Sequence, residues 1–155
     1  MLPDFESFYQ FNFKKLRNFL RRYLGDSKAA EDIAQDAFLQ LWKNPNGYRP
    51  ERGTLKAYLF GIATKRAADW ARHHSRTETC SLEQPVGVQK SMSIAMADAL
   101  DQLEPDMRAL MWLREVEGYR HAELAAIFEI PEGTVKSRLY AGREQLRRIW
   151  ESGAW

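Results

Sequence analysis

The sequence predicts an all-α protein made of two small helical domains joined by a flexible linker. Three observations lead to this prediction. Apolar residues recur at helical spacing through most of the 155-residue chain, and the alternating β-branched runs typical of strands are absent. A polar stretch, residues 76–95, contains Pro85 and Gly87 and is poor in aromatic residues. The first domain is therefore expected over residues 1–75 and the second over residues 96–155.

The first domain is expected to contain three helices. Its first segment places Phe, Tyr and Leu residues at the spacing of a helix. A Gly-Asp-Ser sequence then ends this helix and caps the next one. The following Asn-Pro-Asn-Gly sequence is a strong helix breaker, and YRPERG after it forms a loop before a third long helix. The expected helices cover residues 5–24, about 27–43 and about 54–74.

The second domain is expected to contain four helices, and the last two are separated by only a few residues. Pro131 and Gly133 are expected to make the sharp change of direction between them. A short helix, a tight turn and a longer helix with a basic outer face are typical of a helix-turn-helix. The four expected helices cover residues 96–103, 106–117, 121–128 and 133–150.

The last expected helix carries two stripes of different character. Val135 and Leu139 belong to the stripe that faces the core. Thr134 stands at the helix entry, where its hydroxyl and the free backbone amides can meet a phosphate. Polar side chains early in the helix can then reach base edges in a major groove. The alternative is an ordinary helical hairpin with a solvated basic face. The second, basic stripe and its flanks consist of Lys136, Ser137, Arg138, Tyr140, Arg143 and Arg147.

The net charge of +2 hides a segregation along the chain. Residues 1–75 contain 13 Lys and Arg against 8 Asp and Glu, and residues 132–150 contain 5 against 2. Residues 96–131 between them are acidic, with 3 against 8. The two basic segments suit a polyanionic partner, although charge alone is equally compatible with two solvated faces.

Several classes of protein are excluded or disfavoured by what the sequence lacks. It has no apolar run of about 18 residues and no signal-peptide pattern, so we expect a cytoplasmic protein without a membrane span. Cys80 is the single cysteine, which rules out an internal disulfide, and with His73 and His74 it makes a poor metal set. No catalytic triad, P-loop or metal-ligand spacing is present. We therefore expect no catalytic site, no cofactor, no metal and no small-molecule substrate.

Two parts of the sequence resemble a known family. EIPEGTVKSRLYAGREQLRRI is similar to the C-terminal helix-turn-helix of bacterial sigma factors, and most closely to the extracytoplasmic-function (ECF) type. ALDQLEPDMRALMWLREVEGYRHAELAAIF resembles the helices that precede it. FLRRYLGDSKAAEDIAQDAFLQLWKN resembles the region 2 helix that binds core RNA polymerase, and GTLKAYLFGIATKRAADWARHH the following helix, which handles the melted promoter. The resemblance implies a factor that directs polymerase to promoters and has no catalysis of its own.

The second expected helix has an unusual polar face. Ile33, Ala37 and Leu41 mark its buried side, and the opposite arc places Leu39 among acids and amides. An apolar residue in such an arc suits a protein interface, and the alternative is a solvated acidic face with one stray leucine. The resemblance implies that this arc meets the coiled coil of the largest polymerase subunit. The expected contact residues are Asp32, Gln35, Asp36, Leu39 and Trp42.

The third expected helix and the loop before it are basic and carry nearby aromatics. Cations interleaved with aromatic rings suit single-stranded DNA, although we expect Tyr58 and Trp70 to be core residues rather than stacking platforms. The resemblance implies that the loop holds an unstacked base of the minus-ten element. Lys65 departs from the family, in which Asn is common, and Thr64 replaces an Arg. The expected minus-ten contacts are Tyr48, Arg49, Lys56, Lys65, Arg66 and Arg72.

The C-terminal domain is expected to read the minus-thirty-five element as duplex DNA. Ala141 stands where a basic residue is common in the family, which puts one expected contact in doubt. The following Gly142 costs helix stability, by up to about 1 kcal/mol relative to Ala. The expected minus-thirty-five contacts are Arg114, Thr134, Lys136, Ser137, Arg138, Tyr140, Arg143 and Arg147.

Other kinds of protein remain to be weighed against a sigma factor. A stand-alone transcriptional regulator would use the same DNA-reading helix, but it would not need core polymerase for tight promoter recognition. A protein-only adaptor is disfavoured by the basic stripe of the last helix. ECF factors are often held by an anti-sigma factor, and the resemblance implies such a partner here, besides core RNA polymerase and promoter DNA. The factor would then respond to stress or another signal.

Overall fold

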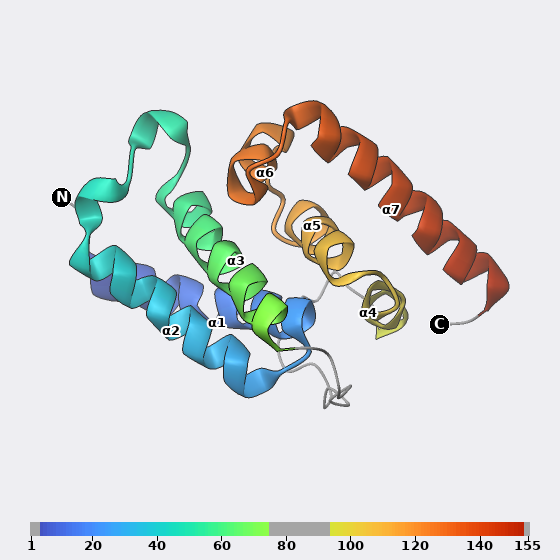
Figure 1. The fold of residues 1–155 in the computed structure, drawn as a ribbon, viewed down its shortest axis with the longest axis horizontal. Coiled ribbons are helices and arrows are strands. Elements are labelled where there is room, and N and C mark those ends of the chain that lie inside the picture. The colour runs from blue at the N-terminus through green and yellow to red at the C-terminus, as the bar shows by residue number, and fades with distance from the viewer. Residues whose placement is uncertain (1–3, 75–93, 154–155) are drawn as a thin grey trace. The chain divides into compact units, whose positions relative to one another are not determined.

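The structure is a computed structural model that describes residues 4–74 and 94–153, and the described residues are helical apart from their connecting turns and loops (Figure 1). The all-α fold class predicted from the sequence is thus confirmed. The chain divides into two compact units, residues 1–85 and 86–155. The predicted linker, residues 76–95, lies outside the described residues except for its last two residues, which already belong to a helix.

The first unit is a bundle of three long helices, in which each helix contacts the other two. Its core is filled by leucine and phenylalanine side chains without solvent exposure, such as Leu16, Phe19 and Phe60. Alanines from the second and third helices complete the core and allow the helices to approach closely. The helices are α1 Phe5–Leu24, α2 Ser27–Lys43 and α3 Leu55–His73.

Side-chain caps set the starts of two of these helices, and the first of them lies in the Gly-Asp-Ser sequence expected to cap α2. The carboxylate of Asp26 accepts a hydrogen bond of 3.0 Å from the amide of Ala29 at the start of α2. The hydroxyl of Thr54 accepts one of 3.1 Å from the amide of Ala57 at the start of α3. Each cap satisfies one of the backbone amides that the first helical turn leaves without a partner.

The described part of the second unit, residues 94–153, forms four helices, and its last helix contacts each of the other three. The core holds leucines without exposure, including Leu113 and Leu124, together with the buried indole of Trp112. The last helix begins one residue earlier than the sequence predicts and ends two residues later. The helices are α4 Ile94–Asp101, α5 Pro105–Glu115, α6 His121–Phe128 and α7 Glu132–Ser152.

The turn between α6 and α7 differs from the prediction. Glu129, rather than a glycine, takes the left-handed conformation there, with φ 56° and ψ 46°. Pro131 then precedes α7 with an extended backbone, and Gly133 lies inside the first turn of α7. The prediction that Gly133 makes the change of direction was therefore wrong. A non-glycine residue in this conformation is uncommon, which is why the sequence pointed to the glycine instead.

Gly142 lets α7 approach α5 closely. A Cβ atom at this position would lie 2.8 Å from the sulfur atoms of both Met107 and Met111. Met111 is buried, so its side chain has little room to move away. The helix propensity that Gly142 sacrifices is therefore compensated by close packing between the two helices.

Gly142→Ala is expected to lower the free energy of unfolding of the second unit by about 1–2 kcal/mol, because overpacking against the methionines outweighs the gain in helix propensity. Urea unfolding of the full chain, followed by the near-ultraviolet circular dichroism of its tryptophans, measures this change. Gly133→Ala is the matched control, since a Cβ there meets nothing within 4 Å. It should leave stability unchanged or raise it. A Gly142→Ala variant as stable as the control variant contradicts the packing argument.

Candidate polymerase-binding and DNA-binding surfaces

The outer face of α2 presents two large apolar side chains to solvent. The buried side of α2 consists of Ala29, Ala30, Ile33, Ala34, Ala37, Phe38 and Leu41. On the opposite side, Leu39 is 48% exposed and Trp42 is 59% exposed. Asp32, Gln35 and Asp36 are exposed beside them. The structure thus brings all five residues expected to bind polymerase onto one exposed face, which we call the α2 face.

The α2 face is partly ordered by its neighbours. The ring of Trp42 meets the ring of Phe5 edge to face, with centroids 4.8 Å apart. This contact fixes one side of the indole and leaves the other side open. Lys28 forms an exposed ion pair with Asp32 at 3.7 Å, which contributes little to stability. The α2 face therefore offers a supported aromatic ring and a leucine within a polar rim.

The loop between α2 and α3 is held in place by two tyrosines. It contains two short 3₁₀ helices, Pro45–Gly47 and Pro50–Arg52. The hydroxyl of Tyr48 donates a hydrogen bond of 2.9 Å to the carbonyl of Gly53. The rings of Tyr48 and Tyr58 lie 5.7 Å apart. These contacts shape the loop and leave Arg49 exposed at its middle.

The expected minus-ten contacts on α3 do not all share one surface. Lys65 and Arg72 are exposed on the outer side, and Arg72 is hydrogen bonded to the carboxylate of Asp69. Lys56 is nine residues before Lys65, so it lies on the opposite side of the helix. Its ammonium group lies 5.8 Å from the centre of the Phe60 ring. The structure therefore does not bring Lys56 together with the other cations of α3.

The two departures from the family pattern on α3 have different settings. Thr64, where many members carry Arg, is only 4% exposed and faces the core. Lys65, where many carry Asn, is exposed and adds a positive charge to the outer side. Trp70 is half-buried and stacks on the ring of His74 at 4.3 Å. The expectation that Tyr58 and Trp70 are core residues holds only in part, because both keep some exposure.

Arg66 joins α3 to α2. Its Nε and Nη2 atoms both donate hydrogen bonds to the side-chain oxygen of Gln40, at 3.1 Å and 2.6 Å. Both residues are exposed, and they lie 26 positions apart in the sequence. The sequence did not indicate Gln40 as a site residue, because nothing in the local pattern of α2 connects it with α3.

The first half of α7 carries exposed polar and basic side chains without acidic partners. Among residues 4–74 and 94–153, no ion pair involves Lys136 or Arg138. Tyr140 is 69% exposed. Ser137 donates a hydrogen bond of 2.9 Å to the carbonyl of Gly133. No side chain caps the start of α7, so its first amides stay available beside Thr134.

The second half of α7 is different, because its arginines are paired with glutamates. Arg143 lies 2.9 Å from the carboxylate of Glu115 on α5. Arg147 lies 2.8 Å from Glu144 and 3.1 Å from Glu151. The hydrogen bonds from Arg147 lower the pKa of the Glu144 carboxyl below its ordinary value. The predicted basic stripe and its flanks thus contain Lys136 and Arg138, which have no ion pair among the described residues, and Arg143 and Arg147, which are paired with glutamates.

Arg114 also has a partner within its own unit. Its Nη1 atom donates a hydrogen bond of 2.7 Å to the carbonyl of Tyr119. This bond braces the loop that connects α5 to α6, and the guanidinium group is half-buried. Arg114 is therefore placed to support the connection between α5 and α6.

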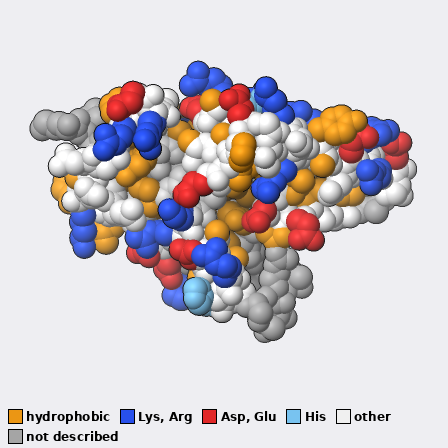
Figure 2. All heavy atoms as spheres, turned by 45° about the horizontal axis from the view of Figure 1, so that its top comes forward, with side chains coloured by type: hydrophobic (Ala, Val, Ile, Leu, Met, Phe, Trp, Pro, Cys, Tyr) orange, Lys and Arg blue, Asp and Glu red, His pale blue; other side chains and the backbone are white. Residues whose placement is uncertain are grey.

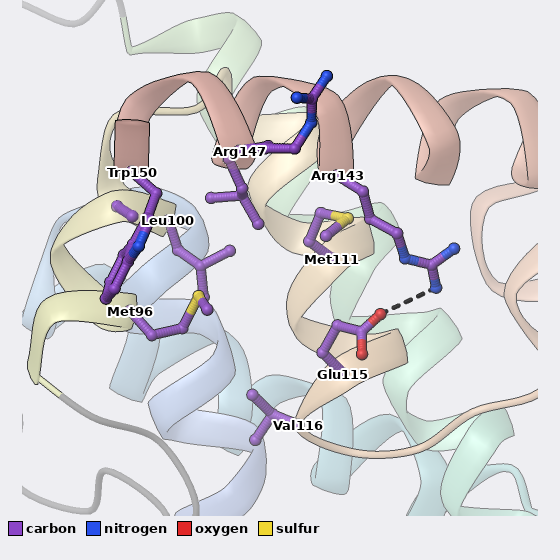
Figure 3. A pocket seen from close by; sticks show the side chains of 10 residues that line it. Met96, Leu100, Met111, Glu115, Val116, Arg143, Arg147 and Trp150 are labelled. Atoms are coloured by element: carbon purple, nitrogen blue, oxygen red, sulfur yellow. Dashed lines mark hydrogen bonds and ion pairs between the residues drawn. The ribbon is translucent and has the colours of Figure 1, made fainter. Parts of the chain in front are cut away.

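An apolar groove of about 590 Å³ lies between α4, α5 and α7. Figure 3 shows Trp150 beside Met96 and Leu100 at one end, with Met111 at the centre. Arg143 crosses the other end toward Glu115, whereas the guanidinium group of Arg147 is turned away from the groove (Figure 3). No local sequence pattern indicates this groove, because its lining comes from three helices. Trp150, Met96 and Met111 are the residues whose type could have suggested an apolar surface here.

Acidic and basic side chains are interspersed on the face drawn in Figure 2, rather than separated into patches. This distribution agrees with the ion pairs described above. Within the described ranges, no helix combines the length and apolar character needed to cross a bilayer. The same residues contain no group of three His, Cys, Asp or Glu side chains that could hold a metal ion.

Comparison with known proteins identifies both units. Residues 8–77 match Sigma-70 region 2, and residues 93–146 match Sigma-70, region 4. The combination of these regions in this order defines an RNA polymerase sigma factor.

The ECF RNA polymerase sigma factor SigL of Mycobacterium tuberculosis is 32% identical over 136 residues, covering 81% of this chain and 77% of SigL. The ECF RNA polymerase sigma factor SigE of Mycolicibacterium smegmatis is 28% identical over 94% of this chain. The chain spans only 61% of the length of SigE. The chain belongs to the ECF RNA polymerase sigma factors.

A solved structure agrees with this assignment. The sigma factor RpoE from Bartonella quintana, in complex with the anti-sigma factor NepR, superposes with a TM-score of 0.76 at 25% identity. The match covers 97% of this chain and 98% of RpoE. Sigma factors are non-catalytic subunits that direct RNA polymerase to initiate transcription at promoters, and they act in the cytoplasm. We refer to the two units below as region 2 and region 4.

Gly47→Ala is expected to destabilise region 2 by about 1 kcal/mol, because the added Cβ would lie 2.6 Å from the hydroxyl oxygen of Tyr58. Tyr58→Phe removes that oxygen, so the double variant should recover most of the loss. Thermal unfolding of the two single variants and the double variant measures the coupling. If the stability losses of the two single variants simply add in the double variant, this contact does not determine the loop conformation.

Proposed function

We propose that this chain binds core RNA polymerase through the α2 face. The exposure of Leu39 and Trp42 within a polar rim carries the proposal. Large apolar side chains ringed by polar groups are the typical composition of an interface centre. Asp32 and Asp36 on the rim suit a partner surface with positive charge. The resemblance to sigma factors points to the coiled coil of the largest polymerase subunit as that partner.

Region 2 then meets the minus-ten element as exposed single strand. Tyr48 and Arg49 in the braced loop are proposed to hold an unstacked base, since a loop with a fixed shape loses little entropy on binding. Lys65 and Arg66 on α3 are proposed to contact the phosphates of the same strand. Arg72 joins them once DNA phosphate competes with Asp69. Lys56, on the other side of α3, contributes only to the general positive field.

Region 4 is proposed to read the minus-thirty-five element with the first half of α7. Thr134 and the uncapped amides receive a phosphate, and Lys136, Ser137, Arg138 and Tyr140 lie toward the groove of the duplex. The absence of ion pairs at Lys136 and Arg138 among the described residues supports assigning DNA contact to the first half of α7. A cation without an internal partner can bind a phosphate without first breaking an ion pair. Arg143 and Arg147 are assigned smaller roles for the opposite reason.

The chain is further proposed to be held inactive by an anti-sigma factor in trans and released by stress or another signal. The Bartonella quintana relative is bound to such a partner, and the match covers nearly the whole of both chains. The apolar groove of region 4 offers a surface that a partner helix can fill. Purification of the native protein from unstressed cells tests this proposal. Recovery of the free chain without a bound inhibitor would contradict it.

Asp36→Arg combined with Leu39→Ala is expected to weaken binding to core polymerase by about a hundredfold, since hot-spot truncations typically cost 2 kcal/mol or more and a charge reversal adds repulsion. Binding of the labelled chain to purified core enzyme measures the change. Asp98→Arg, at an exposed position of α4, is the charge-matched control and should bind normally. Normal binding by the double variant would exclude the α2 face.

Lys136→Ala and Arg138→Ala are each expected to lower the affinity of the holoenzyme for the minus-thirty-five element about tenfold. Arg147→Ala should lower this affinity threefold or less. For each lost phosphate contact, the slope of log affinity against log salt concentration should fall by about 0.9. Titration of upstream promoter duplexes at several salt concentrations gives both values. An Arg147→Ala loss as large as that of Lys136→Ala would contradict the division of α7.

A further inference from the structure

Arg66, one of the proposed minus-ten contacts, is held by a neutral side chain rather than by a carboxylate. Arg72, Arg143 and Arg147 are each paired with a carboxylate, which cancels their charge locally. Arg66 donates hydrogen bonds from two N–H groups to the amide oxygen of Gln40. An amide oxygen fixes the guanidinium group without cancelling its positive charge. Arg66 is therefore oriented and still fully cationic.

We propose that Gln40 is a positioning residue for promoter binding, which holds the Arg66 guanidinium between α2 and α3 so that it meets a phosphate of the minus-ten strand. This inference rests on the proposed role of Arg66 in region 2. Gln40 itself does not touch DNA in this scheme. It acts through Arg66, by restricting a side chain that otherwise samples many rotamers.

The geometry of the contact supports this role. Nε and Nη2 lie on one edge of the guanidinium plane, and both are used by Gln40. The N–H groups of Nη1 and the second N–H of Nη2 stay available for an anion, because arginine carries donors on every edge of its head. Free arginine side chains lose about 2 kcal/mol of rotamer entropy when they are fixed. A contact that fixes Arg66 beforehand removes part of that cost from DNA binding.

The position of Gln40 also connects the two functions of region 2. Gln40 follows Asp36 of the α2 face by four residues, so it stands one helical turn along the same helix, at the border of that face. Arg66 belongs to α3, which carries the proposed minus-ten contacts. The Gln40–Arg66 bond is thus a direct polar link between the helix assigned to polymerase and the helix assigned to DNA.

Two substitutions of Gln40 separate orientation from charge. Gln40→Ala removes the acceptor and frees the arginine. Gln40→Glu keeps an acceptor oxygen in place but neutralises the guanidinium charge, as in the other three arginine pairs. Both should weaken binding of the holoenzyme to a forked promoter fragment with a single-stranded minus-ten segment, by about threefold for Ala and at least as much for Glu. Arg66→Ala should lower the affinity for the same fragment about tenfold.

The decisive comparison places the Gln40 variants in an Arg66→Ala background, using a forked fragment of a promoter that the holoenzyme transcribes. If Gln40 acts through Arg66, neither Gln40 change has a further effect once the arginine is gone. Affinity for core polymerase and the melting temperature should stay unchanged in all variants. Gln10→Ala, an exposed glutamine on α1, is the matched control and should bind DNA normally.

The outcomes distinguish this inference from the proposed function. If Arg66→Ala leaves DNA binding unchanged, Arg66 is not a DNA contact, and both the assignment of Arg66 and the inference are wrong. If Arg66→Ala weakens binding but the Gln40 variants do not, or if they act equally in the Arg66→Ala background, only the inference is overturned. A loss of core polymerase affinity in Gln40→Ala also overturns it, because Gln40 would then be a polymerase contact.

Discussion

Close packing of α2 through its alanines determines where the surfaces of region 2 lie. Ala30, Ala34 and Ala37 have no solvent exposure, and they allow α2 to lie tightly against its two neighbours. A helix packed so closely on one side has a fixed rotation about its axis. Leu39 and Trp42 are therefore presented to solvent by the burial of residues that take no part in binding. The same packing places Gln40 within hydrogen-bonding distance of α3.

Internal pairing of charges divides the cations into two groups. Arginines that face glutamates or aspartates of their own unit stabilise the fold weakly and must exchange partners before they can bind DNA. Lys136 and Arg138 have no such pair in the described part of the chain, and Arg66 is held by a neutral amide. This division explains how a chain of net charge +2 can present local sites for an anionic partner. The number of basic residues in a segment is a weaker guide than their partners.

The sequence was sufficient for the helices and for the outer face of α2, because both follow from the local periodicity of apolar residues. The cap at Asp26 was likewise a local signal. Contacts between residues far apart in the sequence could not be predicted from it. The pairing of Arg143 with Glu115 spans 28 positions, and the Gln40–Arg66 bond spans 26. The left-handed Glu129 and the close approach at Gly142 depend on how two helices meet, which periodicity does not specify.

Site-specific photocross-linking in the complex of the chain, core polymerase and promoter DNA tests the division of surfaces most directly. One photoreactive residue would replace Leu39 on the α2 face, and another would replace Tyr140 on α7. The account predicts that the residue at Leu39 cross-links to the largest polymerase subunit and the residue at Tyr140 to upstream duplex DNA. Cross-linking of position 39 to DNA, or of position 140 to polymerase alone, would contradict it.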